Sequence, residues 1–172
     1  NWEYVLDEAI FTAPAHPHWS GAALLDEFGR LLGIGSLLVQ EAKEEGQALQ
    51  GNMFVPAELL NNILDDLLKY GRVSGPSRPW LGMYVSETDG HLVVSGITQG
   101  GPAAKAGVKP GDVVVMVAGG RPTSIADVFR RYWSLGDAGV DVPLTLMRQG
   151  VRHEITVRSA ERNSLLKKPL LH

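Results

Sequence analysis

The sequence has no cysteine among its 172 residues, which excludes disulfides, zinc–thiolate sites and cysteine nucleophiles. It has no excess of either charge, because 16 Lys and Arg against 19 Asp and Glu give a formal net charge of −3. Nothing therefore indicates binding to nucleic acid or to an anionic membrane surface. No hydrophobic run reaches the length of a transmembrane helix, so we expect no membrane insertion. We also expect no metal and no cofactor.

A stretch rich in proline and glycine, Arg-Val-Ser-Gly-Pro-Ser-Arg-Pro at residues 72–79, is the best candidate for a linker. A chain of this length forms one large or two small domains. We therefore predict two domains, at residues 1–71 and 80–159, with a tail at 160–172. The chain begins with Asn1 rather than methionine, so we expect a fragment or a mature form.

The first half combines strand and helix patterns. Residues 22–25 and 30–40 are typical of two strands, joined by an Asp-Glu-Phe-Gly hairpin turn. The acidic stretch 41–51 suggests a solvated loop, and 52–55 a short strand. Leucines and an isoleucine then recur at helical spacing and predict one helix over 56–70, ending at Gly71.

The second half is organised around residues 101–120. Pro102 suits the first position of a short helix, and Gly107 suits its left-handed end. A Lys-Pro-Gly-Asp turn, the apolar run 113–117 and a Gly-Gly turn follow. Ser124 and Asp127 then form the start of a capped helix, and two alternating strands close the chain.

This combination resembles the signature of the PDZ domains of bacterial periplasmic proteases. The resemblance implies a small β-sandwich or partial barrel with two helices, which binds an extended peptide as an added strand. Trp80-Leu81-Gly82-Met83 matches the family's carboxylate-binding loop, so the expected carboxylate ligands are the N–H groups of Leu81, Gly82 and Met83. Arg78 is either an electrostatic helper of this loop or an ordinary solvated arginine.

The resemblance also implies the two walls of a peptide groove. Met83, Tyr84 and Val85 would form the strand edge that pairs with the ligand. The helix would supply Ile125 with Phe129, or Val128 with Tyr132, and the sequence leaves open which pair faces the groove. The helix does not begin with the histidine of many PDZ domains, so we expect a preference for apolar terminal residues. The expected partners are peptides or unfolded proteins with free C-termini.

The order of elements in the first half resembles the end of an HtrA/DegP-type trypsin-like serine protease domain. Residues 16–24, His-Pro-His-Trp-Ser-Gly-Ala-Ala-Leu, fall on that family's Asn-Pro-Gly-Asn-Ser-Gly-Gly-Pro-Leu. Ser20 therefore takes the nucleophile position by resemblance. His18 takes the place of the glycine whose N–H helps to form the oxyanion hole, which is atypical. The family's catalytic His and Asp belong to an upstream segment outside this chain.

The predicted fold class is mostly β with helices (α+β): part of a trypsin-like β-barrel, followed by a PDZ domain. The leading interpretation is a fragment of a periplasmic HtrA-like endopeptidase, which acts in protein quality control and whose PDZ domain binds C-termini. The alternative is a degenerate protease or adaptor that acts only through PDZ binding. A third interpretation attaches the domain to another PDZ-bearing protease. The parent family is commonly oligomeric, and this chain alone is predicted to be inactive.

Overall fold

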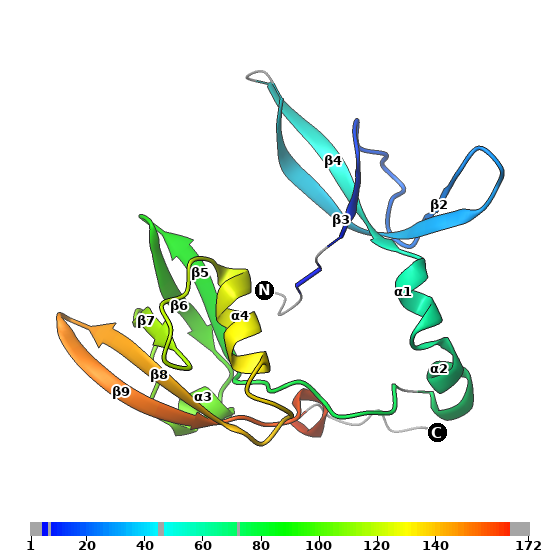
Figure 1. Ribbon diagram of the computed structural model, residues 1–172. Coiled ribbons are helices and arrows are strands. Elements are labelled where there is room, and N and C mark those ends of the chain that lie inside the picture. Colours follow the sequence, from blue (N-terminus) through cyan, green and yellow to red (C-terminus); the bar gives the residue numbers. More distant parts are fainter. Residues whose placement is uncertain (1–4, 7, 45–46, 72, 166–172) are drawn as a thin grey trace. The chain divides into compact units, whose positions relative to one another are not determined.

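The computed structural model describes residues 5–6, 8–44, 47–71 and 73–165 (Figure 1). This part of the chain divides into two compact units. One is Leu6–Ser74, and the other runs from Gly75 onward and includes Val5. The division falls between Ser74 and Gly75. No helix among the described residues is long and apolar enough to cross a membrane.

The first unit is an antiparallel sheet with the strand order β1-β4-β3-β2. Its strands are β1 (Ile10–Thr12), β2 (Ala23–Leu25), β3 (Leu31–Glu44) and β4 (Gln47–Pro56). The register pairs Ile34 with Val55 and Ala42 with Leu49, so β3 and β4 continue through most of the stretch 41–51. The prediction of a loop over 41–51 is therefore wrong. A long hairpin satisfies the backbone of that polar segment through strand pairing.

This sheet buries very little. Among the described residues of the unit, Phe54 is the one aromatic or branched aliphatic side chain that is buried. Seven others on or next to the strands are 38–64% exposed: Phe11, Leu25, Leu31, Leu32, Ile34, Leu37 and Leu38. A sheet needs a second layer over its apolar face to be stable. By itself, the unit leaves the apolar side chains of its sheet without such a layer.

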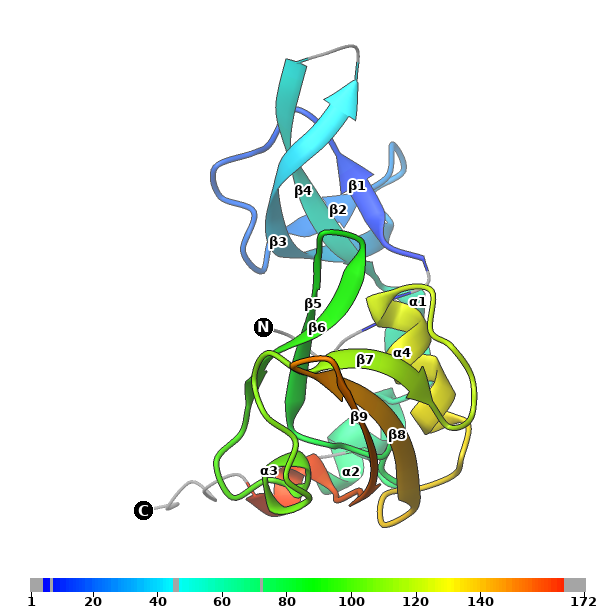
Figure 2. The ribbon, with the colours of Figure 1, turned by 90° about the vertical axis from the view of Figure 1, so that its left-hand side faces the viewer.

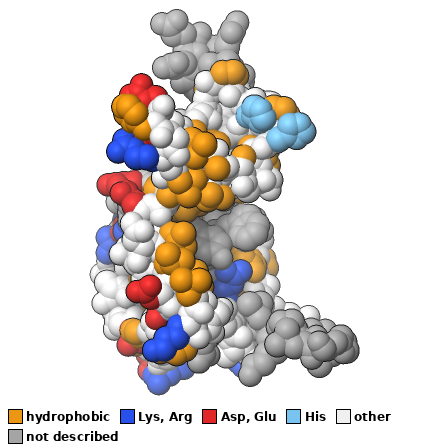
Figure 3. Space-filling model, turned by 90° about the vertical axis from the view of Figure 1, so that its right-hand side faces the viewer, with side chains coloured by type: hydrophobic (Ala, Val, Ile, Leu, Met, Phe, Trp, Pro, Cys, Tyr) orange, Lys and Arg blue, Asp and Glu red, His pale blue; other side chains and the backbone are white. Residues whose placement is uncertain are grey.

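The helical segment that follows β4 is also poorly packed. It consists of α1 (Glu58–Asn61) and α2 (Leu64–Tyr70), so the prediction of a single helix is wrong. Ile63 leaves the helical conformation at φ −127°, where two asparagines precede this β-branched residue. The predicted end is confirmed, because Gly71 adopts φ 67° and donates its N–H to the carbonyl oxygen of Leu67. The leucine side chains of α1 and α2 remain exposed, and hydrophobic side chains gather on the face of the molecule shown in Figure 3.

The second unit is a five-stranded antiparallel sheet with the order β5-β6-β7-β8-β9 (Figures 1 and 2). Its strands are β5 (Met83–Thr88), β6 (His91–Ile97), β7 (Val113–Val117), β8 (Asp141–Arg148) and β9 (Val151–Arg158). The helices are α3 (Pro102–Lys105), α4 (Ile125–Trp133) and the 3₁₀ helix η1 (Arg162–Leu165). The predicted fold class, mostly β with few helices, is confirmed.

Fifteen buried apolar side chains from the strands and both α-helices form the core of the second unit. The predicted cap of α4 is present, because Ser124 Oγ accepts a hydrogen bond from the Asp127 N–H at 3.1 Å. At the first turn of α3, the Ala103 N–H donates to the carbonyl oxygen of Leu81 at 2.8 Å. The short helix thus holds the chain just before β5, where the candidate site lies.

Candidate peptide-binding site

The segment Trp80-Leu81-Gly82-Met83 is fixed by its carbonyl groups. Trp80 exchanges two backbone hydrogen bonds of 3.0 Å with Ala160. The carbonyl oxygen of Leu81 accepts from Ala103, and that of Gly82 accepts from the Thr98 N–H at 2.7 Å. The N–H groups of Leu81 and Gly82, in contrast, donate to no other described residue. Unused amides beside firmly held carbonyls have the arrangement expected of the predicted anion-binding nest.

Gly82 is required at the centre of this segment for two independent reasons. Its φ of +68° lies in the left-handed region, which side chains rarely adopt. A Cβ atom there would also lie 2.9 Å from the Trp80 indole ring and 3.3 Å from Thr98 Cβ. The backbone therefore reaches this conformation, with its amide available, only because the residue is glycine.

The predicted strand wall begins directly after the nest. β5 is the first strand of the sheet and pairs only with β6, so its other edge carries no strand among the described residues. Met83 is buried, whereas Tyr84 and Val85 are half-buried. The Tyr84 hydroxyl lies 3.2 Å from Thr98 Oγ1, so this side chain is held over β6. An open edge of this kind can pair with an extended peptide.

Helix α4 packs close to β5 and forms the second wall. Val128, Phe129 and Tyr132 are all buried in the core, with Phe129 keeping 5% of its surface exposed. Ile125 is half-buried and packs at the edge of the core. The helix side that carries Ile125 and Phe129 continues to Trp133, because these residues are four positions apart.

Arg78 contacts the end of this wall. Its guanidinium carbon lies 4.5 Å from the centre of the Trp133 ring, a cation–π geometry. A hollow of about 340 Å³ is lined by Arg78, Trp80, Trp133 and residues that include Val5. Trp133 was not among the residues predicted from the sequence to line the site. Its spacing of four from Phe129 was the signal that could have included it.

The loop that carries Ser20 is tightly held against β3. The Gly21 N–H donates to the Gly35 carbonyl at 2.9 Å, and the Gly35 N–H donates to Ala22 at 2.8 Å. A Cβ atom at Gly35 would overlap the Trp19 carbonyl oxygen, so the loop needs glycine there. Ser20 itself is exposed, and its hydroxyl forms no hydrogen bond with the described residues.

The two histidines near Ser20 interact with each other. The His18 N–H donates to His16 Nδ1 at 3.2 Å, and the two rings lie 5.9 Å apart. The His16 N–H donates in turn to Oδ1 of the buried Asn52 at 2.6 Å. Neither imidazole forms a hydrogen bond with Ser20 within the described chain. The amide at the predicted oxyanion position is thus already used, and no imidazole among the described residues is hydrogen-bonded to the serine as a base would be.

The PDZ domain family model matches residues 79–158 of this chain. These residues are a PDZ domain. The chain is also similar to the serine protease Do-like HtrA of Lactobacillus helveticus, with 26% identity over 85% of this chain and 38% of the relative. A probable periplasmic serine endoprotease DegP-like of Chlamydia pneumoniae is 28% identical over 84% of this chain and 31% of its own length.

The chain thus spans roughly a third of the length of these curated relatives. The solved structure of the HtrA-type protease AlgW with decapeptide has a TM-score of 0.53 and 24% identity, and the match covers 81% of this chain and 45% of that one. The serine endoprotease from Yersinia pestis has a TM-score of 0.51 and 24% identity, over 81% and 46%. These structures show the fold. The predicted resemblance to the C-terminal region of HtrA/DegP-like serine proteases, with a PDZ domain, is confirmed.

Proposed function

We propose that the PDZ domain binds C-terminal segments of peptides or unfolded proteins as an added strand beside β5. The observation that carries this proposal is the pair of unused amides at Leu81 and Gly82, placed at the start of an unpaired strand edge. A terminal carboxylate accepts hydrogen bonds from such amides, and the preceding peptide backbone pairs with the edge. A single extended conformation of the ligand thereby provides hydrogen-bond partners both for its terminal carboxylate and for the backbone that precedes it.

The side chains around the nest favour an apolar last residue. Leu81 and Met83 are buried beside it, and Phe129 of α4 lies in the same hydrophobic cluster. Arg78 adds a positive charge near the same end, held in place by its contact with Trp133. A positive charge favours a carboxylate over the neutral amide of an internal peptide segment. The expected ligand is therefore a chain terminus, with an apolar final side chain.

For the whole protein, we place this function in an HtrA-like endopeptidase located in the periplasm, with Ser20 at the nucleophile position. The relatives named as periplasmic DegP-like proteases support the location and the chemistry. The exposed apolar surface of β1–β4 supports a barrel that is completed by further protein. The family's oligomers extend the proposal to a homo-oligomeric parent.

A second candidate is a degenerate protease that acts only as a peptide-binding adaptor. The arrangement around Ser20 favours it, because His16 occupies the His18 amide and neither imidazole contacts the serine. A His and an Asp at the family's positions upstream of this sequence would favour the endopeptidase, and their absence there would favour the adaptor.

The test of peptide binding is a fluorescence anisotropy titration of the chain with N-terminally labelled peptides that end in an apolar residue. We expect dissociation constants on the order of micromolar for the free acid, because a single short strand buries little surface. The C-terminally amidated peptide should bind at least tenfold more weakly. Equal affinity for the acid and the amide would contradict the proposal.

A further inference from the structure

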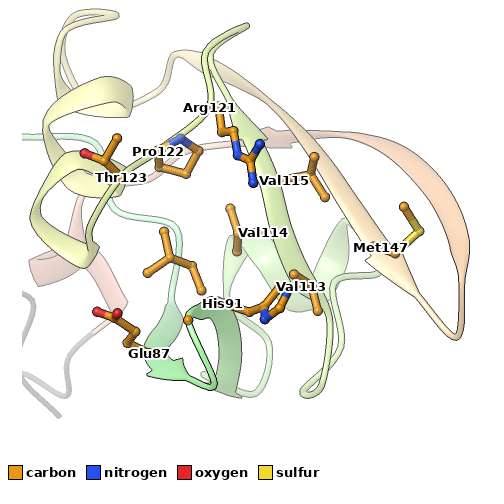
Figure 4. A pocket seen from close by; sticks show the side chains of 11 residues that line it. Glu87, His91, Val113, Val114, Val115, Arg121, Pro122, Thr123 and Met147 are labelled. Atoms are coloured by element: carbon orange, nitrogen blue, oxygen red, sulfur yellow. The ribbon is translucent and has the colours of Figure 1, made fainter.

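A hollow of about 380 Å³ is lined by residues of β5, β6 and β7 and of the loop before α4 (Figure 4). The proposed nest precedes the first residue of β5, so the hollow lies at the opposite end of the proposed groove. Glu87, near the end of β5, lines it on one side. Pro122 and Thr123, which come just before the Ser124 cap of α4, line it on the other. Both walls of the groove therefore lead into the hollow. We infer that it receives an apolar side chain of the bound peptide, from the fifth, sixth or seventh position counted from the C-terminus. This inference rests on the proposed peptide binding.

The hollow arises from the way in which β6 and β7 separate. These two strands share a single registered pair, Val93 with Val113. Beyond that pair β7 turns away to continue its ladder with β8, and its register shifts between Val114 and Met116. Val115 is the extra residue of this bulge. A bulge bends its strand and locally increases the twist, which opens the space between the two strands.

The lining of the hollow combines apolar side chains with charged and polar ones. Its apolar members are the buried Leu92 and Val114 and the half-buried Val113, Val115 and Met147. Glu87, His91 and Arg121 stand around the opening (Figure 4). The carboxylate and the guanidinium at the rim have opposite charges, so the rim does not select a ligand of one sign. The interior gains free energy from any aliphatic side chain that leaves water to enter it.

The direction of strand addition identifies the occupant. A peptide whose carboxylate lies at the start of β5 must pair antiparallel to β5. Its upstream residues then extend along the strand toward Thr88. Each residue of a strand advances about 3.3 Å, so the four steps from Met83 to Glu87 cover roughly 13 Å. If the last peptide residue lies beside Met83, the fifth from the end lies beside Glu87. The next one or two residues then reach the hollow, so a tetrapeptide is too short to enter it.

The experiment compares three labelled peptides with identical last four residues and free C-termini, titrated against the full chain. One is the tetrapeptide, and two are octapeptides with serine at every upstream position except the sixth from the end. That position is leucine in one and serine in the other. We expect the leucine octapeptide to bind about three- to tenfold more tightly than the serine octapeptide. Equal affinities of the two octapeptides, with the leucine placed at the fifth, sixth or seventh position, would overturn the inference.

Variants of a residue that lines the hollow test whether the tighter binding of the leucine octapeptide arises there. Val115→Lys should reduce the ratio of the affinities of the leucine and serine octapeptides to about one, because the lysine ammonium group must be desolvated when an aliphatic side chain enters the hollow. Val115→Thr, which keeps the volume, should reduce the ratio partially and serves if the lysine variant does not fold. The matched control is Val151→Lys, at an exposed position of β9 outside the hollow, and it should retain the ratio. If both Val115 variants keep the affinity ratio of the unaltered chain, the leucine side chain binds outside the hollow.

The same titrations separate this inference from the proposed function. If the tetrapeptide acid binds and its amide does not, the groove assignment stands. If the leucine octapeptide then binds no more tightly than the serine octapeptide, the inference about the hollow fails and the proposed peptide binding stands. If acid and amide bind alike, or neither binds, the proposed function fails and this inference fails with it.

Discussion

Asp112 and Arg148 form a two-point ion pair that joins the turn before β7 to the end of β8. Arg148 Nε donates to Asp112 Oδ1 at 2.6 Å, and the Arg148 Nη2 atom donates to Oδ2 at 2.7 Å. The same Nη2 donates to the carbonyl oxygen of Gly107 at 2.9 Å, at the end of α3. Through Gly107 the pair is tied to the end of α3, the helix whose Ala103 N–H donates to the carbonyl oxygen of Leu81.

We predict that Asp112→Asn destabilises the PDZ domain strongly. Asp112 is completely buried, and its loss leaves the Arg148 guanidinium without its partner. Breaking such a buried pair costs about 3–5 kcal/mol of unfolding free energy. Asp141→Asn is the matched control, because the Asp141–Arg158 pair is exposed on both sides and should contribute little. Urea unfolding of both variants checks the difference, and similar midpoints would contradict the role given to Asp112.

The same carboxylate predicts a dependence of stability on pH. Burial alone would raise the pKa of Asp112, but hydrogen bonds from Arg148 and from the Lys109 N–H, with the charges of Arg148 and His153, hold the pKa below its ordinary value of 3.8. A carboxyl with a lowered pKa stabilises the folded state above the unfolded pKa, and this stabilisation is lost as the pH falls below about 4. Unfolding free energies measured from pH 6 down to pH 2 should decline less steeply in Asp112→Asn than in the unaltered chain.

We predict that Gly82→Ala abolishes peptide binding while the domain stays folded. The added methyl group forces the backbone from φ +68° and meets the Trp80 ring, so the Leu81 and Gly82 amides lose their alignment. Affinity for a free C-terminus should fall at least tenfold. Gly150→Ala is the control, since Gly150 has φ +77° in the β8–β9 turn but open space around it. Equal losses in both variants would indicate a general effect of backbone strain.

Local patterns in the sequence predicted the PDZ half well. Ser124 caps its helix and Gly107 takes a positive φ value, because each of these features depends on a few neighbouring residues. The Asp112–Arg148 pair was not predictable in this way, because 36 residues separate its members. The Arg78–Trp133 contact was missed for the same reason.

The first half was predicted less well because its tertiary contacts decide its structure. The leucine spacing over 56–70 predicted one helix, but a helix of that length depends on packing of its apolar face. That face has little to pack against here, and the helix breaks at Ile63. The domain ranges and the role of Ser20 remain predictions.

Arg78 offers a test of electrostatic assistance. We predict that Arg78→Ala weakens binding of a free C-terminus a few-fold and makes the affinity less sensitive to salt, because one favourable long-range charge is lost. Affinity for the amidated peptide should change much less. Arg152→Ala, an exposed arginine on β9 paired with Glu154, is the control and should leave both affinities unchanged. An equal effect of Arg78→Ala on acid and amide would instead assign Arg78 a packing role on Trp133.

The last prediction concerns Ser20 and the absence of peptide hydrolysis by this chain. Acyl transfer by a serine needs a base to accept the hydroxyl proton and preset donors for the oxyanion. The His18 N–H, at the predicted oxyanion position, is bonded to His16 Nδ1, and the Ser20 hydroxyl contacts neither imidazole in the described chain. Without a base the rate falls by several orders of magnitude.

The measurement is incubation of the purified chain with unfolded casein and with a fluorophosphonate probe, beside Ser20→Ala as a control. We expect no cleavage and no labelling above the level of the control. Serine-dependent labelling would contradict the prediction and would make His16 and His18 the candidate bases. Comparison of His16→Ala with His18→Ala would then identify the base, because only loss of the base should abolish the labelling.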